Sequence, residues 1–490
     1  MWPFSRTKSP SLPPLVLHNT LSGQDDAFAP LGRTVKMYNC GPTVYDYQHI
    51  GNMRPYIFAD TLRRALEVNG YKVKQVINFT DVGHLTGDNE GDPNVGQDKV
   101  EKKAAEEGLS VEVIVTRVTK AYYEDLDRLN INRGKIIFAR ATDHIREQIA
   151  LVKTLEEKGY TYKTEDGIYF DTSKFREYGK LGNIDIEGLK EGARVEKVSG
   201  KKNLTDFALW KFSPKNAKRQ QEWDSPWGVG FPGWHLECSA IAMSFLGPQL
   251  DIHTGGIDHI PIHHNNEIAQ SECATGKQFS RFWLHNAFIT VEGKKISKSI
   301  GNTIYVRNII DRGLSPIALR LWFLGAHYRS PMNFSWEALE GSQTALVRLH
   351  RHFVEDLPTK SGTVDEGLFR AFLEAINNDL DTPKALAIMW DTVKNTTLPD
   401  PEKRATLLAF DRVLGLGLSE SNAKLLAMLA GKEHRLAIQE IPSEIHTISE
   451  EREAARSKGD FAEADRLRAL AAEKGYQIED TPAGPKFKKL

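Results

Sequence analysis

The sequence predicts an α/β protein built on a doubly wound parallel sheet, with an insertion inside the sheet domain and helices after it. Over residues 34–82, a strand, a glycine–proline turn, a helix and a second strand follow one another. This β–α–β order is the unit from which parallel sheets of the Rossmann type are built. Short strand-like runs rich in glycine and tryptophan break the order over 160–232. From about residue 340 the chain is strongly helical and poor in glycine.

Length and composition indicate a globular protein of several units. At 490 residues the chain is too long for one ordinary core, and it predicts three or four packed units. Hydrophobic residues make up 40% and charged residues 26% of the chain, as is usual for globular proteins. The 64 lysines and arginines against 65 aspartates and glutamates leave a net charge of −1, so any nucleic-acid contact must be a local patch.

Nothing in the sequence indicates a membrane segment or secretion. No uninterrupted apolar run approaches the roughly 18 residues that a membrane helix needs. Residues 1–14 lack the apolar segment of a signal peptide, and we interpret them as a leader. The three cysteines, Cys40, Cys238 and Cys273, are too few and odd in number for a disulfide framework. They favour a reducing compartment, and the expected location is the cytoplasm.

Hydrophobic periodicity and turn residues predict the elements of the sheet domain. In its first part these are a strand at 34–40, an amphipathic helix at 54–70, a strand at 71–82 and a long polar helix at about 98–129. In its second part they are a helix at 234–246, a strand at 250–256 and a helix that opens at Pro261. Ligands of such sheets bind at the carboxyl ends of the strands, where Cys40 and His49 fall.

Two further segments have a distinctive composition. Residues 194–219, within the insertion, hold two acidic residues against eight basic ones, Arg194, Lys197, Lys201, Lys202, Lys211, Lys215, Lys218 and Arg219. The last 45 residues are expected to form a charged helix followed by a turn-rich tail. The basic segment predicts a contact with an anionic partner. For the tail, the alternative is a plain interaction domain.

A metal site is the first chemical hypothesis. His263 and Glu267 are four residues apart on the predicted helix, so their side chains share one face and could bind one ion. Cys273 is about 15 Å further along the axis and on another face, which favours a small buried hydrophobe. His264 is a rival to His263, because a spacing of three residues would also bring it to Glu267.

The two other cysteines could complete that site. Cys238 lies in the helix at 234–246 and Cys40 ends the first strand, so both could converge at the carboxyl edge of the sheet. Two thiolates, an imidazole and a carboxylate suit Zn²⁺ better than Mg²⁺ or Ca²⁺. Spacing alone leaves open the alternative that all four are buried structural residues.

Two short motifs predict an ATP site. His49-Ile50-Gly51-Asn52 opens a helix, where His49 and Asn52 can present hydrogen-bond donors to an anion and Gly51 permits a close approach to the backbone. Lys295-Ile296-Ser297-Lys298-Ser299 lies in a glycine-flanked polar loop, from which Lys295 and Lys298 could close over a triphosphate. Taken singly, each motif could also be an ordinary capped helix start or a solvated basic loop.

In this order the two motifs resemble the paired signatures of class I aminoacyl-tRNA synthetases. Three segments carry the four candidate metal ligands, and they resemble the cysteinyl-tRNA synthetase family specifically. These segments are Cys40–Tyr45, Gly233–Cys238 and His263–Glu267. Other matching segments are Asp206–Lys211, Trp223–Trp227, His327–Pro331 and Asn377–Pro383. The resemblance extends over nearly the whole chain.

The resemblance implies roles for individual residues. It makes Cys40, Cys238, His263 and Glu267 the ligands of one Zn²⁺. It assigns catalysis to His49, Asn52, Lys295 and Lys298, and ATP binding to His49, Gly51, Asn52, Gly255, Gly256, Asp258 and Lys298, with Mg²⁺ accompanying the nucleotide. Thr80 and Trp234 would line the cysteine pocket. One segment departs from the family: this chain has Gly83-His84-Leu85 where many relatives continue with Asp-Asp-Lys, which leaves the role of these three positions open.

The resemblance also implies a domain plan. It consists of a leader (1–14), the first half of the nucleotide-binding catalytic domain (15–140), a connective insertion (141–232), the second half (233–290), a lysine loop and stem-contact region (291–345), a helical tRNA-binding domain (346–440) and a C-terminal anticodon-end module (441–490). In that module Phe487, flanked by Lys486, Lys488 and Lys489, could stack on an unpaired base.

The implied activity is that of a cysteine–tRNA ligase. The enzyme would activate L-cysteine with ATP, release pyrophosphate and transfer cysteine to the 3′-terminal ribose of tRNA(Cys), with class membership implying the 2′-hydroxyl. Zinc would select the thiol, since size alone separates cysteine and serine poorly. The expected working unit is a monomer. The alternatives are a cysteine ligase with a small amine acceptor, of the mycothiol-pathway type, and a catalytically inactive RNA-binding relative.

Overall fold

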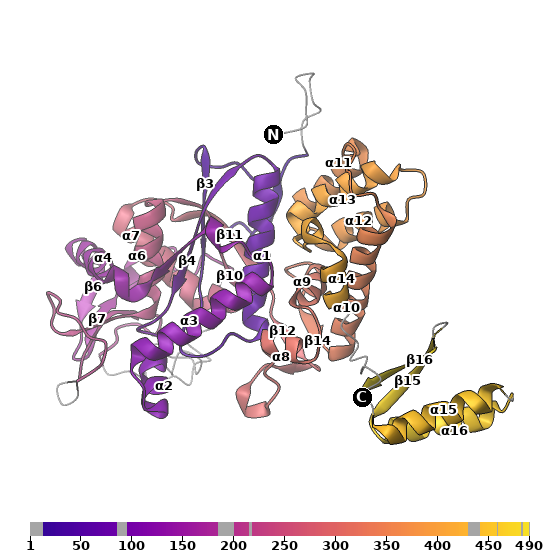
Figure 1. The fold of residues 1–490 in the computed structure, drawn as a ribbon. Coiled ribbons are helices and arrows are strands. Elements are labelled where there is room, and N and C mark those ends of the chain that lie inside the picture. Colours follow the sequence, from indigo (N-terminus) through magenta and orange to yellow (C-terminus); the bar gives the residue numbers. More distant parts are fainter. Residues whose placement is uncertain are drawn as a thin grey trace.

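The computed structural model describes residues 13–85, 96–184, 200–214, 218–429, 442–457, 459–481 and 484–489 (Figure 1). Most of the predicted leader therefore lies outside the described residues, as do Arg194, Lys197 and Lys215 of the basic segment and the expected boundary at 440/441. Within the described part, no helix is both long and apolar enough to cross a membrane.

A five-stranded parallel sheet forms the centre of the catalytic unit, as the sequence predicts. Its strand order is β11-β10-β3-β4-β5. The strands are β3 (Thr34–Asn39), β4 (Lys72–Phe79), β5 (Ile136–Arg140), β10 (Leu250–Gly256) and β11 (Ser280–Asn286). The first three come from one half of the chain and the last two from the other, so the insertion divides a single sheet. A short hairpin of β1 (Val16–Asn19) and β2 (Gln24–Ala27) precedes the sheet.

The first helix, α1 (Ile50–Val68), begins earlier than the predicted 54–70. His49 is its N-cap and Asn52 its third residue, and each side chain accepts a hydrogen bond from the other's backbone N–H. This capping box satisfies two N–H groups that would otherwise lack partners, so the helix includes the first signature motif. Pro55 lies inside the helix, in its second turn, and has no N–H to donate to the carbonyl four residues before it.

The polar stretch at 98–129 is two helices, not the single one expected. These are α2 (Lys99–Glu107) and α3 (Val111–Arg128). Gly108 ends α2 in the left-handed conformation, with φ of 65°, and Ser110 then caps α3 through its hydroxyl. A glycine stop followed by a serine start is a strong local break.

The insertion forms its own antiparallel sheet beside the main one. Its four strands, in the order β6-β7-β8-β9, are β6 (Thr161–Lys163), β7 (Gly167–Phe170), β8 (Phe207–Phe212) and β9 (Gly230–Pro232). Helix α4 (Ile145–Glu157) leads into it and packs on α6 (Trp234–Leu246) and α7 (Asn265–Thr275). The last strand, β9, runs almost directly into α6, which positions the start of that helix.

The second half of the domain follows the prediction closely. Both α6 and β10 span the predicted residues. The helix expected to open at Pro261 begins as a wider π-helical turn, Ile260–His264, which continues into α7. After β11, a small sheet joins β12 (Ile289–Val291), β13 (Lys294–Lys295) and β14 (Met332–Phe334).

The chain is helical from about residue 340 to 429, as predicted, and two further helices precede that region. These helices are α8 (Val306–Asp311), α9 (Pro316–Leu324), α10 (Trp336–Arg351), α11 (Glu366–Asn377), α12 (Thr382–Lys394), α13 (Asp400–Leu414) and α14 (Ala423–Leu429). The C-terminal end differs from the prediction. Its charged stretch forms two helices, α15 (Ser443–Ser457) and α16 (Phe461–Glu473), and the expected turn-rich tail is a hairpin of β15 (Tyr476–Thr481) and β16 (Gly484–Lys489).

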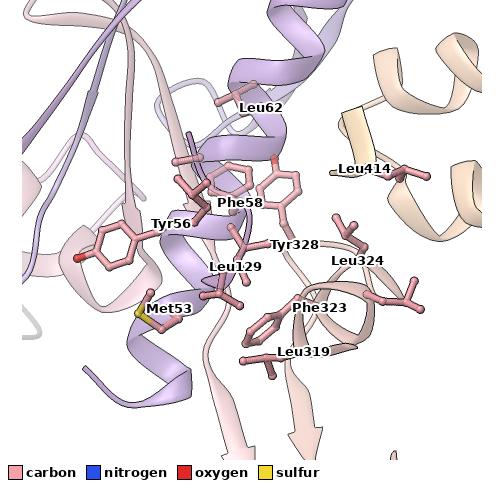
Figure 2. Packing of buried hydrophobic residues seen from close by; sticks show 14 of the residues in the cluster. Met53, Tyr56, Phe58, Leu62, Leu129, Leu319, Phe323, Leu324, Tyr328 and Leu414 are labelled. Carbon is pink, nitrogen blue, oxygen red and sulfur yellow. The ribbon is translucent and has the colours of Figure 1, made fainter. Parts of the chain in front are cut away.

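One apolar core joins the catalytic sheet to the helical region through α1 (Figure 2). Phe58 of α1 stacks on Tyr328, with ring centroids 4.4 Å apart. On the same helix, Asp60 is fully buried and binds three guanidinium groups: Arg63, Arg64 at 2.6 Å and Arg320 of α9 at 2.7 Å. Burial raises the pKa of Asp60, but the three arginines outweigh burial and hold this pKa below its usual value. The helix that carries the His49 motif is thus anchored to the helical region.

We expect Asp60→Ala to lower the free energy of unfolding by about 3–5 kcal/mol, because Arg320 would remain buried without its counter-charge. Urea denaturation measures the effect. The matched control is Glu374→Ala, which breaks the exposed pair with Arg370, 3.2 Å apart, and should cost less than about 1 kcal/mol. Equal losses in the two variants would show that the buried cluster has no special weight.

Candidate active site

Four predicted metal-binding side chains meet at one point. Single ligand atoms of Cys40, Cys238, His263 and Glu267 all lie within 4.8 Å of one another, and all four residues are buried. Cys40 directly follows β3, Cys238 belongs to α6, and the other two lie on the π-helical turn and on α7. Elements from both halves of the chain therefore contribute to one donor set at the carboxyl edge of the sheet.

Neighbouring histidines orient two of these groups. The His263 Nε2 atom lies 3.1 Å from Glu267 Oε1, while its Nδ1 atom lies 2.9 Å from Nδ1 of His235. The other carboxylate oxygen of Glu267 lies 2.9 Å from Nε2 of His253. Outer groups that hold the second nitrogen or oxygen of a ligand are typical of metal sites, because they fix its orientation.

A second donor set overlaps the first. Cys40, His253, His264 and Glu267 also bring one atom each within 4.8 Å of one another. His264, the rival that spacing alone leaves open, lies 3.3 Å from Cys40 Sγ through Nε2 and 2.7 Å from His285 through Nδ1. The chemistry of the donors separates the two sets, because only the set with Cys238 and His263 offers two thiols. That set fits Zn²⁺ better.

The buried groups of the first set shift one another's proton affinity. Burial raises the pKa of Cys238, but hydrogen bonds with Cys40 and His263 outweigh burial and bring it to about 6. Burial lowers the pKa of His263, but Cys238 and Glu267 raise it to about 10. Burial raises the pKa of Glu267, and His253 and His263 lower it to about 2. Burial, followed by the neighbouring Cys238, raises the pKa of Cys40 well above its usual value.

The predicted cysteine-pocket residues border this set. Trp234, the first residue of α6, is half-buried and stacks on His263 with centroids 4.4 Å apart. The Thr80 hydroxyl donates a short hydrogen bond to Glu237, which also accepts one of 3.1 Å from Asn78. Burial raises the pKa of Glu237 well above its usual value. The structure thus places the Trp234 indole against His263 of the donor set and the Thr80 hydroxyl against Glu237, the residue before Cys238.

The two ATP signature motifs also lie together. The backbone N–H of Ile50 donates to Ile304, just after the lysine loop, at 2.8 Å. A Cβ atom at Gly51 would lie 3.0 Å from the His49 ring and 3.0 Å from Ile296, so a larger residue would press on both motifs where they touch. Burial lowers the pKa of His49 to about 4, so its imidazole is neutral near pH 7.

The two lysines of the second motif differ in their surroundings. Lys298 forms a short ion pair with Asp46, and its ammonium group lies 5.5 Å from the ring centre of Tyr45. Burial lowers the pKa of Lys298. Lys295 is exposed on β13, and its carbonyl accepts a hydrogen bond of 3.0 Å from Asn302. Lys298 therefore reaches the segment after Cys40, and Lys295 does not share that contact.

The Gly255-Gly256 pair ends β10 beside the histidines. A Cβ atom at Gly255 would lie 2.6 Å from the His264 ring, and one at Gly256 would lie 2.3 Å from the Asp258 carboxylate. The buried His264 ring leaves no room for a side chain at Gly255, whereas a side chain at Gly256 would displace the Asp258 carboxylate. Asp258 follows in a short 3-10 turn, Ile257–His259, at the same sheet edge.

Several predicted residues lie apart from this centre. Cys273 packs in the apolar cluster of α4, α6 and α7, as expected of a small hydrophobe, and burial raises its pKa to about 11. In the basic segment, Lys211 pairs with Asp166, Lys202 lies 3.5 Å from Asp171, and Arg219 lies 3.1 Å from Glu101. Internal acidic groups thus neutralise much of the described basic segment. The Phe487, Lys486, Lys488 and Lys489 side chains lie outside the described part, so base stacking stays a prediction.

Sequence reasoning missed the histidines around the donor set. His235, His253 and His285 are each buried and contact a candidate ligand or its rival, yet no local spacing connects them to the metal motif. The available signal was weak: His235 lies in the predicted helix that carries Cys238, and His253 lies in the predicted strand that ends at Gly255-Gly256. Sequence reasoning also missed Asp98 and Lys99, which pack against the departing segment at Gly83 and His84.

Comparison with known proteins gives the class that this fold and site define. Residues 28–344 match the family described as the tRNA synthetases class I (C) catalytic domain. A methionyl-tRNA synthetase of Mycobacterium tuberculosis bound by methionyl-adenylate shows the same fold, with a TM-score of 0.52 and 15% identity over 82% of this chain and 92% of that one. The protein is thus a ligase of the class I aminoacyl-tRNA synthetase type.

Closer relatives narrow the class. The chain is 46% identical to cysteine–tRNA ligase 1 of Burkholderia lata over 97% of both chains. It is 41% identical to cysteine–tRNA ligase of Treponema denticola over 97% of this chain and 100% of that one. The chain therefore belongs to the cysteine–tRNA ligase family. These matches run through the helical C-terminal region, which does not favour the small-acceptor alternative.

We expect metal binding by the Cys238–His263 set to release about two protons at about pH 8. At that pH Cys238 and Glu267 are already ionised, whereas Cys40 is a thiol and His263 an imidazolium, and both must lose a proton to bind a metal. Affinity for Zn²⁺ should then rise about a hundredfold per pH unit between the pKa values of about 6 and about 10.

Calorimetric titration of metal-free protein in two buffers of different ionisation enthalpy measures the proton count. Release of about one proton or fewer would instead favour the set with His264, whose pKa burial lowers well below its usual value.

Proposed function

We propose that this chain activates L-cysteine with ATP and transfers it to the 3′-terminal ribose of tRNA(Cys), with one Zn²⁺ held by Cys40, Cys238, His263 and Glu267. The observation that carries the proposal is the meeting of two thiols, an imidazole and a carboxylate beside Thr80 and Trp234. This meeting point lies on the same sheet edge as the ATP signature. A thiol-specific metal site next to a nucleotide site suits an enzyme that activates cysteine.

The metal would supply selectivity for sulfur, because a bound zinc ion deprotonates a coordinating thiol and binds a neutral hydroxyl weakly. The protein's own part is to hold the ligands and exclude water. His253 lies within hydrogen-bond distance of the Oε2 atom of Glu267, and His235 lies within hydrogen-bond distance of the Nδ1 atom of His263. These contacts orient the two ligands. Serine and cysteine are near-isosteres, so selection by size alone would be poor. Selection of the thiol by the metal would make a separate editing site unnecessary.

In the first step the cysteine carboxylate attacks the α-phosphorus of ATP, a C–O–P bond forms and pyrophosphate leaves. The protein must position both reactants and stabilise charge on the phosphate oxygens. We assign positioning of the nucleotide to His49, Gly51 and Asn52 at the N-terminus of α1, where the helix dipole also favours an anion. Lys298 and Lys295 stabilise the departing pyrophosphate, which Mg²⁺ accompanies. Gly255, Gly256 and Asp258 would border adenosine.

In the second step the ester of cysteine forms with a ribose hydroxyl of the tRNA and AMP leaves. We assign tRNA contacts to the stem-contact region 291–345, the helical domain 346–440 and the C-terminal module 441–490. The catalytic domain halves, 15–140 and 233–290, and the insertion 141–232 complete this plan. Class membership implies the 2′-hydroxyl as acceptor, and the proposed working unit is a monomer.

Two assays on the purified chain test the proposed function. Cysteine-dependent exchange of pyrophosphate into ATP, without RNA, should occur and should be weak with serine. Attachment of cysteine to tRNA(Cys) should follow when the tRNA is added. Exchange without attachment would point to a small amine acceptor, and absence of both reactions would point to an inactive relative.

We expect Lys298→Ala to slow pyrophosphate exchange by about 10²–10³-fold while changing the KM for cysteine less than about threefold. The reason is that the ammonium group acts on charge that develops on the phosphates, not on the amino acid. The matched control is Lys294→Ala, the exposed lysine of the same hairpin, which should stay within about threefold of the parent in both constants. A normal exchange rate in Lys298→Ala would contradict this role.

A further inference from the structure

The segment Gly83-His84-Leu85, whose role the sequence leaves open, lies against the proposed cysteine pocket. The His84 ring is parallel to the Trp234 indole, with an interplanar angle of 5° and centroids 4.2 Å apart. The same indole stacks on His263 at 4.4 Å. Trp234 is therefore held by one imidazole of the donor set and by one imidazole that has no part in that set.

Both nitrogens of His84 are engaged. Nε2 lies 2.6 Å from the Lys99 ammonium, and Nδ1 lies 2.6 Å from the Thr43 hydroxyl. An ammonium group can only donate, so Nε2 accepts, and Nδ1 of the neutral ring donates to Thr43. Burial, followed by the charge of Lys99, lowers the pKa of His84 well below its usual value, which agrees with a neutral ring. The two hydrogen bonds fix the plane of the imidazole.

The backbone brings His84 to this position through Gly83. Gly83 has φ of 82°, and a Cβ atom there would lie 2.4 Å from the carbonyl oxygen of Pro232, at the end of β9. Only glycine allows these two segments of the backbone to come so close. Pro232 lies two residues before Trp234, so this approach places His84 directly against the indole.

A second segment locks the arrangement. The Asp98 carboxylate accepts a hydrogen bond of 2.6 Å from the Gly83 N–H and caps α2 through Val100 and Glu101. The Lys99 N–H donates to the His84 carbonyl at 2.9 Å. An Asp-Lys pair thus returns from a later point of the chain to the segment at Gly83 and His84. Asp98, Lys99 and His84 are all buried.

We propose that His84 is a positioning residue for cysteine binding: held by Lys99 and Thr43, it sets the orientation of the Trp234 indole and so the shape of the amino-acid pocket. The proposal rests on the proposed function. His84 connects the segment after Cys40, the start of the helix that carries Cys238, and α2. Its contacts lie on the amino-acid side, whereas the groups assigned to ATP lie at His49 and Lys298.

The test is steady-state pyrophosphate exchange with cysteine and ATP varied separately, on zinc-loaded protein. We expect His84→Ala to raise the KM for cysteine about tenfold, the effect of losing one aromatic contact. The KM for ATP should change less than about twofold and kcat less than about threefold. Full zinc content and an unchanged unfolding midpoint would separate this effect from general damage.

Three further variants keep the result interpretable. Lys99→Met removes only the donor to Nε2 and should raise the KM for cysteine about threefold, which gives a reading if His84→Ala fails to fold. His144→Ala removes a histidine that contacts Phe245 at 5.3 Å, outside the site, and should leave both KM values unchanged. In a Trp234→Phe background, His84→Ala should have a smaller effect than in the parent, because both changes act on the same wall.

The outcomes distinguish this inference from the proposed function. A parent enzyme without cysteine-dependent exchange would overturn the proposed function. An active parent with a normal KM for cysteine in His84→Ala, equal rises of the KM for cysteine and for ATP, or full additivity with Trp234→Phe would overturn the positioning role alone.

Discussion

Strand β3 pairs in parallel with β10 on one side and with β4 on the other, and the placement of the site follows from that pairing. The carboxyl ends of the three strands lie side by side, so Cys40, Thr80 and the Gly255-Gly256 turn meet at one edge. Gly41 makes the exit from β3 possible, since a Cβ atom there would lie 1.6 Å from the carbonyl oxygen of Asn78. A parallel sheet of this kind collects residues from distant parts of the chain into one crevice.

The donor set at this edge is electrostatically demanding. A thiolate, an imidazolium and a carboxylate are buried together, and for each of them the neighbouring hydrogen bonds and charges taken together outweigh the effect of burial on its pKa. Such a group is costly unless its members are paired or bind a metal. His235 and His253 lie within hydrogen-bond distance of His263 and Glu267, and His285 lies within hydrogen-bond distance of the rival His264. The site therefore has an inner layer of candidate donor groups and an outer layer of histidines that orient them.

Helix α1 connects the nucleotide signature motif with the helical region. Its N-terminus carries the His49 capping box, and its middle packs Phe58 on Tyr328 (Figure 2). Asp60 of the same helix pairs with Arg320. One rigid helix thus runs from the nucleotide signature to the helical region to which tRNA contacts are assigned. The close approach of Ile296 to Gly51 adds a second link, because it places the motif Lys295–Ser299 against the start of the same helix.

The sequence by itself determined the parts of this protein that depend on local rules. Periodicity and turn residues located β10 and α6 at their observed bounds, and the spacing of His263 and Glu267 predicted that they share a helix face. Local rules failed where short segments compete. The sequence predicts one continuous helix across Gly108, because a glycine inside a polar run allows several structures. It predicts turns where the C-terminal hairpin lies, because a tail that contains prolines also allows several structures.

Only the tertiary structure decided which residues act together. Spacing could not choose between His263 and His264, because both reach Glu267; the contacts of His264 with Cys40 and His285 show a second overlapping set that no local pattern reveals. Nor could it show that Asp98 and Lys99 return to His84, since that contact depends on the close approach of Gly83 to β9. Local sequence sets the shape of each element, whereas contacts between distant elements depend on how the whole sheet packs, and that information is spread over the entire chain.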